Sequence, residues 1–199
     1  MASELGAPMA SSVVMDERTG VQLTPGGAIT AALFRIGMGL VYLYAFVAAG
    51  FGIFYSNSTM TPSGATTYGW YFTVDTSKGW ITSGFKVSPT AGFVSITHGP
   101  LAPIVQHLPT GVDDFGWMFA TLGLGVALTL GIFMRIAGWG ALALNVLLWF
   151  SLFPPSTNPV FDAEHMAFGL GILLLMYVHA GNRWGLGRWW SRVTPRWLN

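Results

Sequence analysis

The 199-residue chain is 52% hydrophobic and only 9% charged, whereas about 25% of the residues in an ordinary soluble domain are charged. This composition indicates a membrane protein. The formal net charge of +1 gives no indication of nucleic-acid binding, and the absence of cysteine excludes disulfides, thioether-linked haem and iron–sulfur ligation by this chain.

The N-terminal residues 1–27 include acidic side chains but no basic region ahead of an apolar core, which favours a polar tail over a cleaved signal peptide. After this tail, four stretches approach or exceed the roughly 20 apolar residues that a helix needs to cross a bilayer. They lie at about 28–54, 116–134, 136–153 and 160–180. The sequence therefore predicts an all-α integral membrane protein, a four-helix transmembrane bundle in a membrane domain that covers residues 28–181.

Local signals mark the ends of these spans. Thr24 and Pro25 precede the first span, and a single cation, Arg135, separates the second from the third. So short a connection predicts a tight antiparallel pair of helices. Asn158 and Pro159 are typical of an N-cap and a first-turn proline, and they predict the start of the fourth span.

The basic residues indicate an orientation, because Arg and Lys near helix ends are retained on the cytoplasmic side. If both termini are cytoplasmic, seven arginines fall on that side: Arg18, Arg35, Arg135, Arg183, Arg188, Arg192 and Arg196. Lys78 and Lys86 then lie outside, in the long loop 55–115. The chain is expected to be multi-pass, with residues 1–27 and the basic, aromatic residues 182–199 as cytoplasmic tails.

The external loop 55–115 is rich in aromatic and aliphatic residues, unlike a disordered linker. It is therefore expected to fold down onto the bundle. Its glycines and prolines predict short strands or helical turns, bounded by Gly84, Pro89, Pro100, Pro103 and Pro109.

Arg35 and Asn145 fall inside predicted spans, where an ionisable group costs roughly 2.5–3.5 kcal/mol on insertion scales. Arg35 lies about two turns into the first span. It either snorkels to the inner headgroups or anchors a quinone carbonyl, a lipid phosphate or a partner's carboxylate. Asn145 is interpreted first as an interhelical hydrogen-bonding residue, and alternatively as a second contact to quinone or lipid.

Three titratable residues, Asp162, Glu164 and His165, lie at the start of the fourth span. The carboxylates suit capping of a helix N-terminus. His165 does not, because a protonated imidazole is disfavoured there, and it lies one turn after Asp162 on the same face. The pair either ties down the preceding loop or moves a proton and orients a bound head group. Asp162 and His165 are thus the candidate catalytic residues.

Haem and metal sites remain minor alternatives. His165 and His179 share one helical face, but no other span supplies matching histidines for stacked haems. His98, His107, Asp162 and His165 have no recognisable metal-ligand spacing, so no metal is expected. Close helix contact, and not nucleotide binding, explains the glycines inside the spans, namely Gly37, Gly39, Gly123, Gly125, Gly169 and Gly171.

Several segments form a familiar set: "LFRIGMGLVYLYAF", "GFVSITHGPLAPIVQHL", "TLGLGVALTLGIFMRIAGWGALAL", "PPSTNPVFDAEHMAFGLGILLL" and "GNRWGLGRWW". Over about residues 28–190 the chain resembles the DoxX/DoxD family. The most specific motif is N-P-x-x-D-x-x-H, matched by Asn158, Pro159, Asp162 and His165. Phe168 stands where many relatives have a tyrosine, so a role of that phenol is not carried over to this chain.

The resemblance implies a four-helix bundle in a prokaryotic inner membrane, similar to the membrane subunit of a thiosulfate:quinone oxidoreductase. It implies electron transfer from thiosulfate or another small external reductant to quinone, without haem, iron–sulfur cluster or flavin in this chain. Expected partners are lipid, quinone and other membrane subunits. The alternative is a non-catalytic accessory subunit of a respiratory-chain complex, which the aromatic loop and the lack of a cofactor motif favour. A transporter is less favoured, because neither half has broken helices or an inverted repeat.

Overall fold

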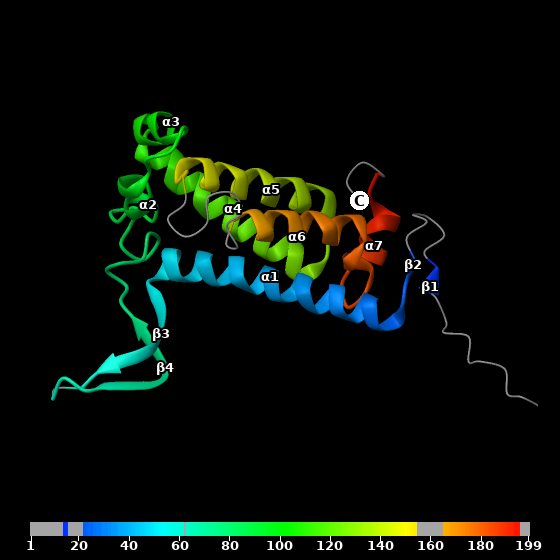
Figure 1. Ribbon diagram of the computed structural model, residues 1–199, viewed down its shortest axis with the longest axis horizontal. Helices are drawn as coiled ribbons and strands as arrows, with labels where there is room; N and C mark the ends of the chain where they lie inside the picture. Colours follow the sequence, from blue (N-terminus) through cyan, green and yellow to red (C-terminus); the bar gives the residue numbers. More distant parts are fainter. Residues whose placement is uncertain (1–13, 16–21, 62, 155–164, 196–199) are drawn as a thin grey trace, which may run out of the picture.

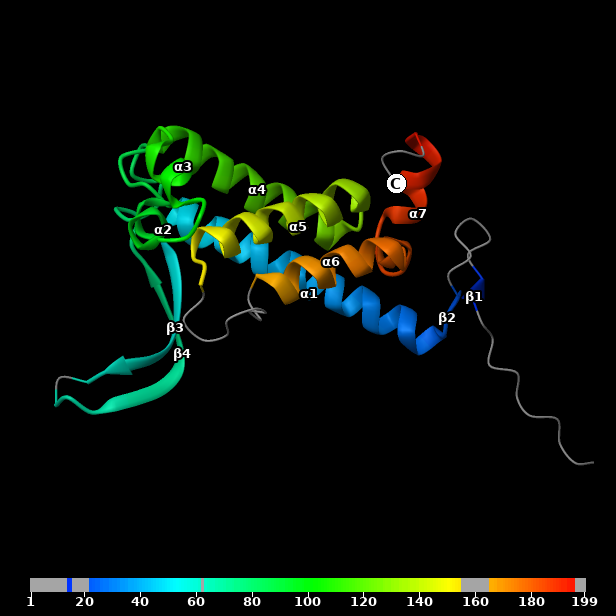
Figure 2. The ribbon, with the colours of Figure 1, turned by 45° about the horizontal axis from the view of Figure 1, so that its top comes forward.

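The computed structural model describes residues 14–15, 22–61, 63–154 and 165–195. Four helices lie side by side in Figures 1 and 2: α1 (Pro25–Phe51), α4 (Thr110–Leu130), α5 (Met134–Ser151) and α6 (Met166–Tyr177). We call this group the helical body. The pairs α1 with α4 and α5 with α6 make its most extensive contacts. By length and composition, α1 and α5 are each able to cross a membrane, and α6 is a shorter apolar helix.

Shorter elements surround the helical body. They are β1 (Val14–Met15), β2 (Gln22–Leu23), β3 (Ile53–Met60), β4 (Thr66–Val74), α2 (Ala91–Ile96), α3 (Ala102–His107), the 3-10 helix η1 (Ala180–Asn182) and α7 (Gly187–Val193). The prediction of a mainly helical chain is confirmed. The prediction of an all-α chain is wrong, because β3 and β4 pair as an antiparallel hairpin just after α1.

The first helix begins at Pro25, and residues at both of its ends cap it. Thr24 is the N-cap, and its hydroxyl oxygen accepts a hydrogen bond of 3.1 Å from the N–H of Gly27. Pro25 occupies the first turn, where its missing N–H has no consequence. Gly52 ends the helix with a φ of 71°, and its N–H donates to Ala48 O. The helix therefore runs three residues earlier at both ends than the predicted span 28–54.

The turn between α4 and α5 lies before Arg135, and not at it as predicted. Gly131 adopts a φ of 72° and ends α4, since glycine reaches this left-handed conformation without steric cost. Arg135 then lies in the first turn of α5. The predicted tight antiparallel pair is confirmed, although α4 begins at Thr110, six residues before the expected 116.

The start predicted for the fourth span, including Asn158 and Pro159, lies outside the described residues. Within the described part, the helix begins at Met166 directly after His165 and ends at Tyr177, three residues before the predicted end. It ends there because His179 takes a φ of 50° and opens the turn into η1.

Glycines allow two of the helix pairs to approach closely. A Cβ added at Gly39 would lie 2.6 Å from a main-chain nitrogen of α4, and one added at Gly125 would lie 2.9 Å from a main-chain nitrogen of α1. Gly169 on α6 similarly faces α5, at 3.2 Å. Close helix contact is thus confirmed for these three. It is wrong for Gly37 and Gly123, because a Cβ there would meet nothing within 4 Å.

The predicted short elements between Gly84 and Pro109 are confirmed as the helical turns α2 and α3, whereas the strands β3 and β4 lie before the predicted boundaries. The expectation that the loop folds down onto the helices is wrong for its first part. Figures 1 and 2 show the β3–β4 hairpin projecting away from the helical body, whereas α2 and α3 lie at one end of the helical body. The two strands pair with each other along their inner edges, and the hairpin projects as a two-stranded unit.

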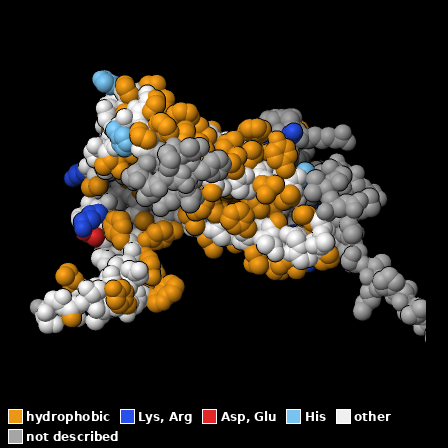
Figure 3. Space-filling view, in the orientation of Figure 1, with side chains coloured by type: hydrophobic (Ala, Val, Ile, Leu, Met, Phe, Trp, Pro, Cys, Tyr) orange, Lys and Arg blue, Asp and Glu red, His pale blue; other side chains and the backbone are white. Residues whose placement is uncertain are grey.

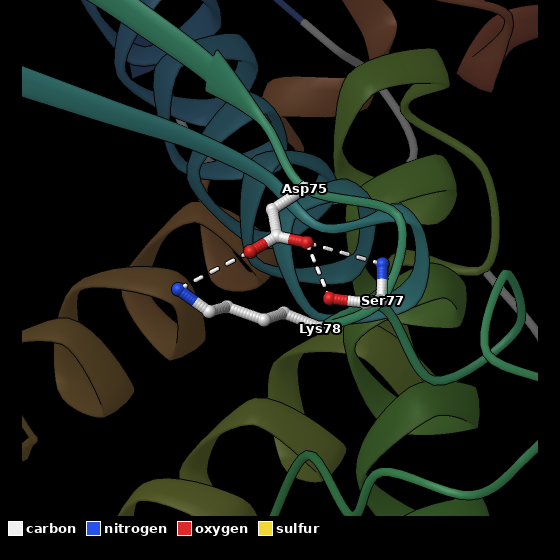
Figure 4. A network of polar contacts seen from close by, with 3 residues as sticks. All are labelled: Asp75, Ser77 and Lys78. Carbon is white, nitrogen blue, oxygen red and sulfur yellow. Dashed lines mark hydrogen bonds and ion pairs between the residues drawn. The ribbon is translucent and has the colours of Figure 1, made fainter.

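A small polar turn closes the base of the hairpin (Figure 4). The Oδ1 atom of Asp75 accepts hydrogen bonds from the Ser77 hydroxyl, at 2.5 Å, and from the Ser77 N–H, at 3.2 Å. Lys78 Nζ lies 3.3 Å from Oδ2. The hydrogen bonds from Ser77, and then the contact with Lys78, hold the pKa of Asp75 below its ordinary value.

Candidate functional site

The most constrained polar group of the helical body is the guanidinium of Arg35, whose residue has 0% exposed surface. It lies ten residues from the first residue of α1, or about 15 Å along the helix axis. A charge at such a position requires compensation, because burial in a low-dielectric interior disfavours it strongly. Arg35 does not snorkel to a surface, so its compensation must come from the protein.

All five N–H groups of Arg35 donate to main-chain carbonyl oxygens. Nε donates to Ala180 at 3.2 Å, Nη1 to Leu128 and, at 2.9 Å, to Thr129. Nη2 donates to Arg183 at 3.3 Å and to Trp184 at 3.0 Å. A guanidinium has five N–H donors, so this set uses its full capacity. We call these five carbonyls the arginine cage.

The cage is assembled from chain segments that carry unused carbonyls. Leu128 and Thr129 belong to the last turn of α4, and Ala180 follows the end of α6. The final carbonyls of a helix have no intrahelical partner and carry a partial negative charge. The C-terminal end of α4 and the main-chain carbonyls of residues 180–184 therefore stabilise Arg35 in place of a carboxylate. Arg35 in turn ties α1 to α4 and to the segment after α6.

Glycines give the guanidinium its space. A Cβ added at Gly131 would lie 3.0 Å from Nη1 of Arg35, and one added at Gly185 would lie 3.0 Å from Nη2. A Cβ at Gly187 would lie 2.5 Å from the carbonyl oxygen of Gly181. The stretch "GNRWGLGRWW" thus has a physical reason for its glycines. A glycine ending α4 and three more glycines after α6 were the sequence signals for this cage, and sequence reasoning missed them.

A second buried polar contact crosses the centre of the helical body. Asn145 is 4% exposed, and its Nδ2 donates to the Tyr42 hydroxyl at 2.9 Å and to Ala141 O at 2.8 Å. Tyr42 lies on α1 and Asn145 on α5, two helices that are not among the closely packed pairs. The interpretation of Asn145 as an interhelical hydrogen-bonding residue is confirmed.

Asp114 is a buried polar residue that the sequence analysis did not single out. It is 5% exposed, and its Oδ1 accepts hydrogen bonds of 2.6 Å from both the Ser88 and the Thr90 hydroxyl. This carboxylate fixes residues 88–90 of the external loop against the first turns of α4. The sequence signal was an Asp pair at 113 and 114, three residues after Thr110 and ahead of an apolar run.

The histidines lie apart from this network of buried contacts. His165 directly precedes α6, and its proposed partner Asp162 lies outside the described residues. Nδ1 of His98 lies 3.0 Å from Ile96 O, and Nδ1 of His107 lies 2.6 Å from Pro103 O, both on the exposed loop. Within the described ranges, no group of three or more His, Asp or Glu side chains is arranged to hold a metal ion.

The predicted site residues are therefore not brought together in the part of the chain that the structure describes. Arg35 and Asn145 occupy two separate contacts, and the role of Asp162 with His165 stays a prediction. A quinone carbonyl at Arg35 would have to displace one of five main-chain acceptors. Comparisons with protein-family models, with curated proteins and with solved structures gave no match.

Proposed function

We propose that this chain is a multi-pass membrane protein in which α1, α4, α5 and α6 cross the bilayer, and that it serves as a non-catalytic accessory subunit beside other membrane proteins. One observation carries the accessory role. Both candidate quinone contacts, Arg35 and Asn145, donate all of their side-chain N–H groups to the protein itself.

The outer surface of the helical body supports the membrane assignment. Of the most apolar segments of α1 and α5, only 28% and 33% are buried inside the protein, whereas a core helix of a soluble protein is mostly buried. Large apolar side chains face outward on all four helices, as Figure 3 shows for one side of the molecule. They include Leu33, Leu40 and Val41 on α1, Phe119 on α4, Ile136 and Trp139 on α5, and Leu174 on α6. A monomeric soluble protein rarely exposes so continuous an apolar surface.

The lengths of α1 and α4 and the internal polarity agree with this assignment. At 1.5 Å per residue, the 27 residues of α1 extend about 40 Å and the 21 residues of α4 about 31 Å. The hydrocarbon core of a bilayer is about 30 Å thick. The arginine cage makes Arg35 tolerable at this depth, because the protein supplies every hydrogen-bond acceptor.

Charge supports one orientation. Arg135 begins α5 at the end of the helical body that also carries Arg183, Arg188 and Arg192. Lys78 and Lys86 lie in the external loop at the other end. By the positive-inside rule, the α7 end is cytoplasmic and the hairpin end is external. The plasma membrane of a prokaryote, which the DoxX/DoxD resemblance implies, is the proposed location.

The test is purification of the full chain from native membranes in a mild detergent, followed by identification of its companions. We expect respiratory-chain membrane proteins to copurify, and their turnover to be unchanged by His165→Ala. The competing function is electron transfer from thiosulfate to quinone, with Asp162 and His165 moving protons. It would replace the accessory role if the isolated chain reduces a quinone analogue with thiosulfate, loses that activity in His165→Ala, and keeps it in the matched control His98→Ala.

A further inference from the structure

The projecting β3–β4 hairpin has two halves of different chemistry. The near half, residues 53–56 and 70–74, reads "IFYS" and "WYFTV", whereas the far half, residues 57–69, is rich in Ser, Thr and Gly. From residue 53 to residue 74 the sequence contains no Asp, Glu, Lys, Arg or His. An exposed strand pair in water usually carries charges, since they keep its edges from pairing with other chains.

Three of the five aromatic residues of the near half, Tyr55, Trp70 and Phe72, gather on one face. Tyr55 is the cross-strand partner of Phe72, and Trp70 lies two residues from Phe72 on the same side of the strand. The Tyr55 ring centroid is 5.5 Å from that of Trp70 and 5.5 Å from that of Phe72. Trp70 is 82% exposed and Phe72 is 65% exposed. This aromatic face is therefore presented outward, without cover from the described part of the chain.

The root of the hairpin is fixed to the outer end of α1. The N–H of Asp75 donates to Gly52 O at 2.9 Å, and the N–H of Trp80 donates to Ala49 O at 2.9 Å. The N–H of Tyr55 donates at 2.8 Å to the hydroxyl of Tyr44, an exposed residue of α1. The near half thus starts on the outward side of α1, where the proposed function places lipid.

The direction of the hairpin changes at its bulge. The strand register shifts between Ser56 and Ser58, and such an irregularity bends a strand pair. In Figures 1 and 2, the near half runs across the direction of the helices, and the far half turns away from the helical body. If the helices cross a bilayer, the near half runs along its surface and the far half points into water.

We propose that the near half of the hairpin lies in the headgroup layer of the outer leaflet, with Tyr55, Trp70 and Phe72 in contact with lipid, while the far half remains in water. Trp and Tyr rings favour this layer, and a segment without charge enters it without breaking an ion pair. The free edges of the strands remain hydrated there, which the hydrocarbon core would not permit. This inference rests on the proposed membrane-spanning role.

The chain has no cysteine, so single-cysteine variants of the full protein can each carry one fluorescent label. We would compare Trp70→Cys in the near half, Ser63→Cys at the exposed tip, and Leu40→Cys on the outward side of α1. Each variant is reconstituted in phosphatidylcholine vesicles containing nitroxide-labelled lipid. The fluorescence of the label in Trp70→Cys should fall by roughly half with the nitroxide near the headgroup. The label in Ser63→Cys should be unaffected by the lipid and quenched by aqueous iodide.

The variant Leu40→Cys separates the two ways in which the idea can fail. If its label is quenched by acyl-chain nitroxide and the label of Trp70→Cys is not quenched by headgroup nitroxide, the hairpin proposal is overturned and the membrane assignment stands. If lipid nitroxides leave the label of Leu40→Cys unquenched, the membrane assignment itself fails. If the label of Trp70→Cys is shielded from both iodide and lipid, a second copy or another protein covers the aromatic face, and the lipid proposal is also overturned.

Discussion

The arginine cage surrounds Arg35 in the first half of α1, whereas the β3–β4 hairpin follows the end of that helix, and the two regions satisfy their polar groups in different ways. At the cage, one buried side chain joins three distant segments, and glycines leave room for it. At the hairpin, main-chain hydrogen bonds join the inner edges of the two strands, and the aromatic side chains are exposed. We therefore expect the cage to be sensitive to single substitutions and the exposed hairpin to tolerate them.

The largest expected effect is at Arg35. Arg35→Met leaves five carbonyls of the cage without their donor, and each buried unsatisfied group costs about 1–3 kcal/mol. We expect the free energy of unfolding in detergent to fall by at least about 3 kcal/mol, with an intermediate loss for Arg35→Lys, whose ammonium has three donors. Denaturant or thermal unfolding measures this. The exposed Arg192→Gln is the matched control, and equal stability of Arg35→Met and that control would contradict the cage.

Gly185→Ala tests the space around the guanidinium. Its Cβ would lie 2.7 Å from the Gly181 carbonyl oxygen and 3.0 Å from Arg35 Nη2. We expect a loss of about 1–3 kcal/mol in the free energy of unfolding, from overpacking. Gly123→Ala is the control, because a Cβ there meets nothing within 4 Å, and alanine inside a helix is better than glycine by about 1 kcal/mol. If the free energy of unfolding changes in the same direction in both variants, the tight packing of the cage is contradicted.

The Tyr42–Asn145 contact should have a smaller effect. Tyr42→Phe and Asn145→Leu each remove a buried hydrogen bond between α1 and α5, and such bonds in membrane proteins contribute about 1 kcal/mol. A double-mutant cycle on unfolding free energies should show that the two losses are not additive. Strict additivity would mean that the two side chains do not interact in the folded protein.

The smallest effect is expected at the hairpin base. The folded-state pKa of Asp75 is lowered, mainly by Ser77. The contribution of Asp75 to the stability of the hairpin base is therefore present above the ordinary carboxyl pKa of about 3.9. It is lost as the pH falls through the lowered pKa of the folded state. Amide hydrogen exchange of residues 75–78, compared with α1, should detect loosening of the base at acid pH. Asp75→Asn should remove the pH dependence, and an unchanged profile in that variant would assign it to another group.

Local signals predicted the helices well. Thr24 with Pro25 marks the start of α1. The apolar runs locate most of the ends of α4 and α5 to within a few residues. The turn between α4 and α5 was misplaced, since Arg135 is the more visible feature of the sequence while Gly131 supplies the left-handed conformation that ends α4. The hairpin was predicted only as short strands, because its alternating aromatic and polar residues do not reveal whether its faces are covered.

The candidate site was harder to predict. Arg35 was identified from its position in an apolar run, but its five acceptors are main-chain carbonyls that any sequence would supply. Asn145 was correctly interpreted as an interhelical contact, whereas its partner Tyr42 could not be named without knowing how α1 and α5 lie relative to each other.

The sequence by itself determined that this is an apolar, cysteine-free chain of long helices with arginines near one end, because composition and periodicity follow from the order of residues alone. The tertiary structure decided that the end of α4 and the carbonyls of residues 180–184 surround Arg35 and that the aromatic hairpin projects outward. These depend on which distant carbonyls and surfaces meet, and that is set by packing geometry rather than by any local pattern of residues.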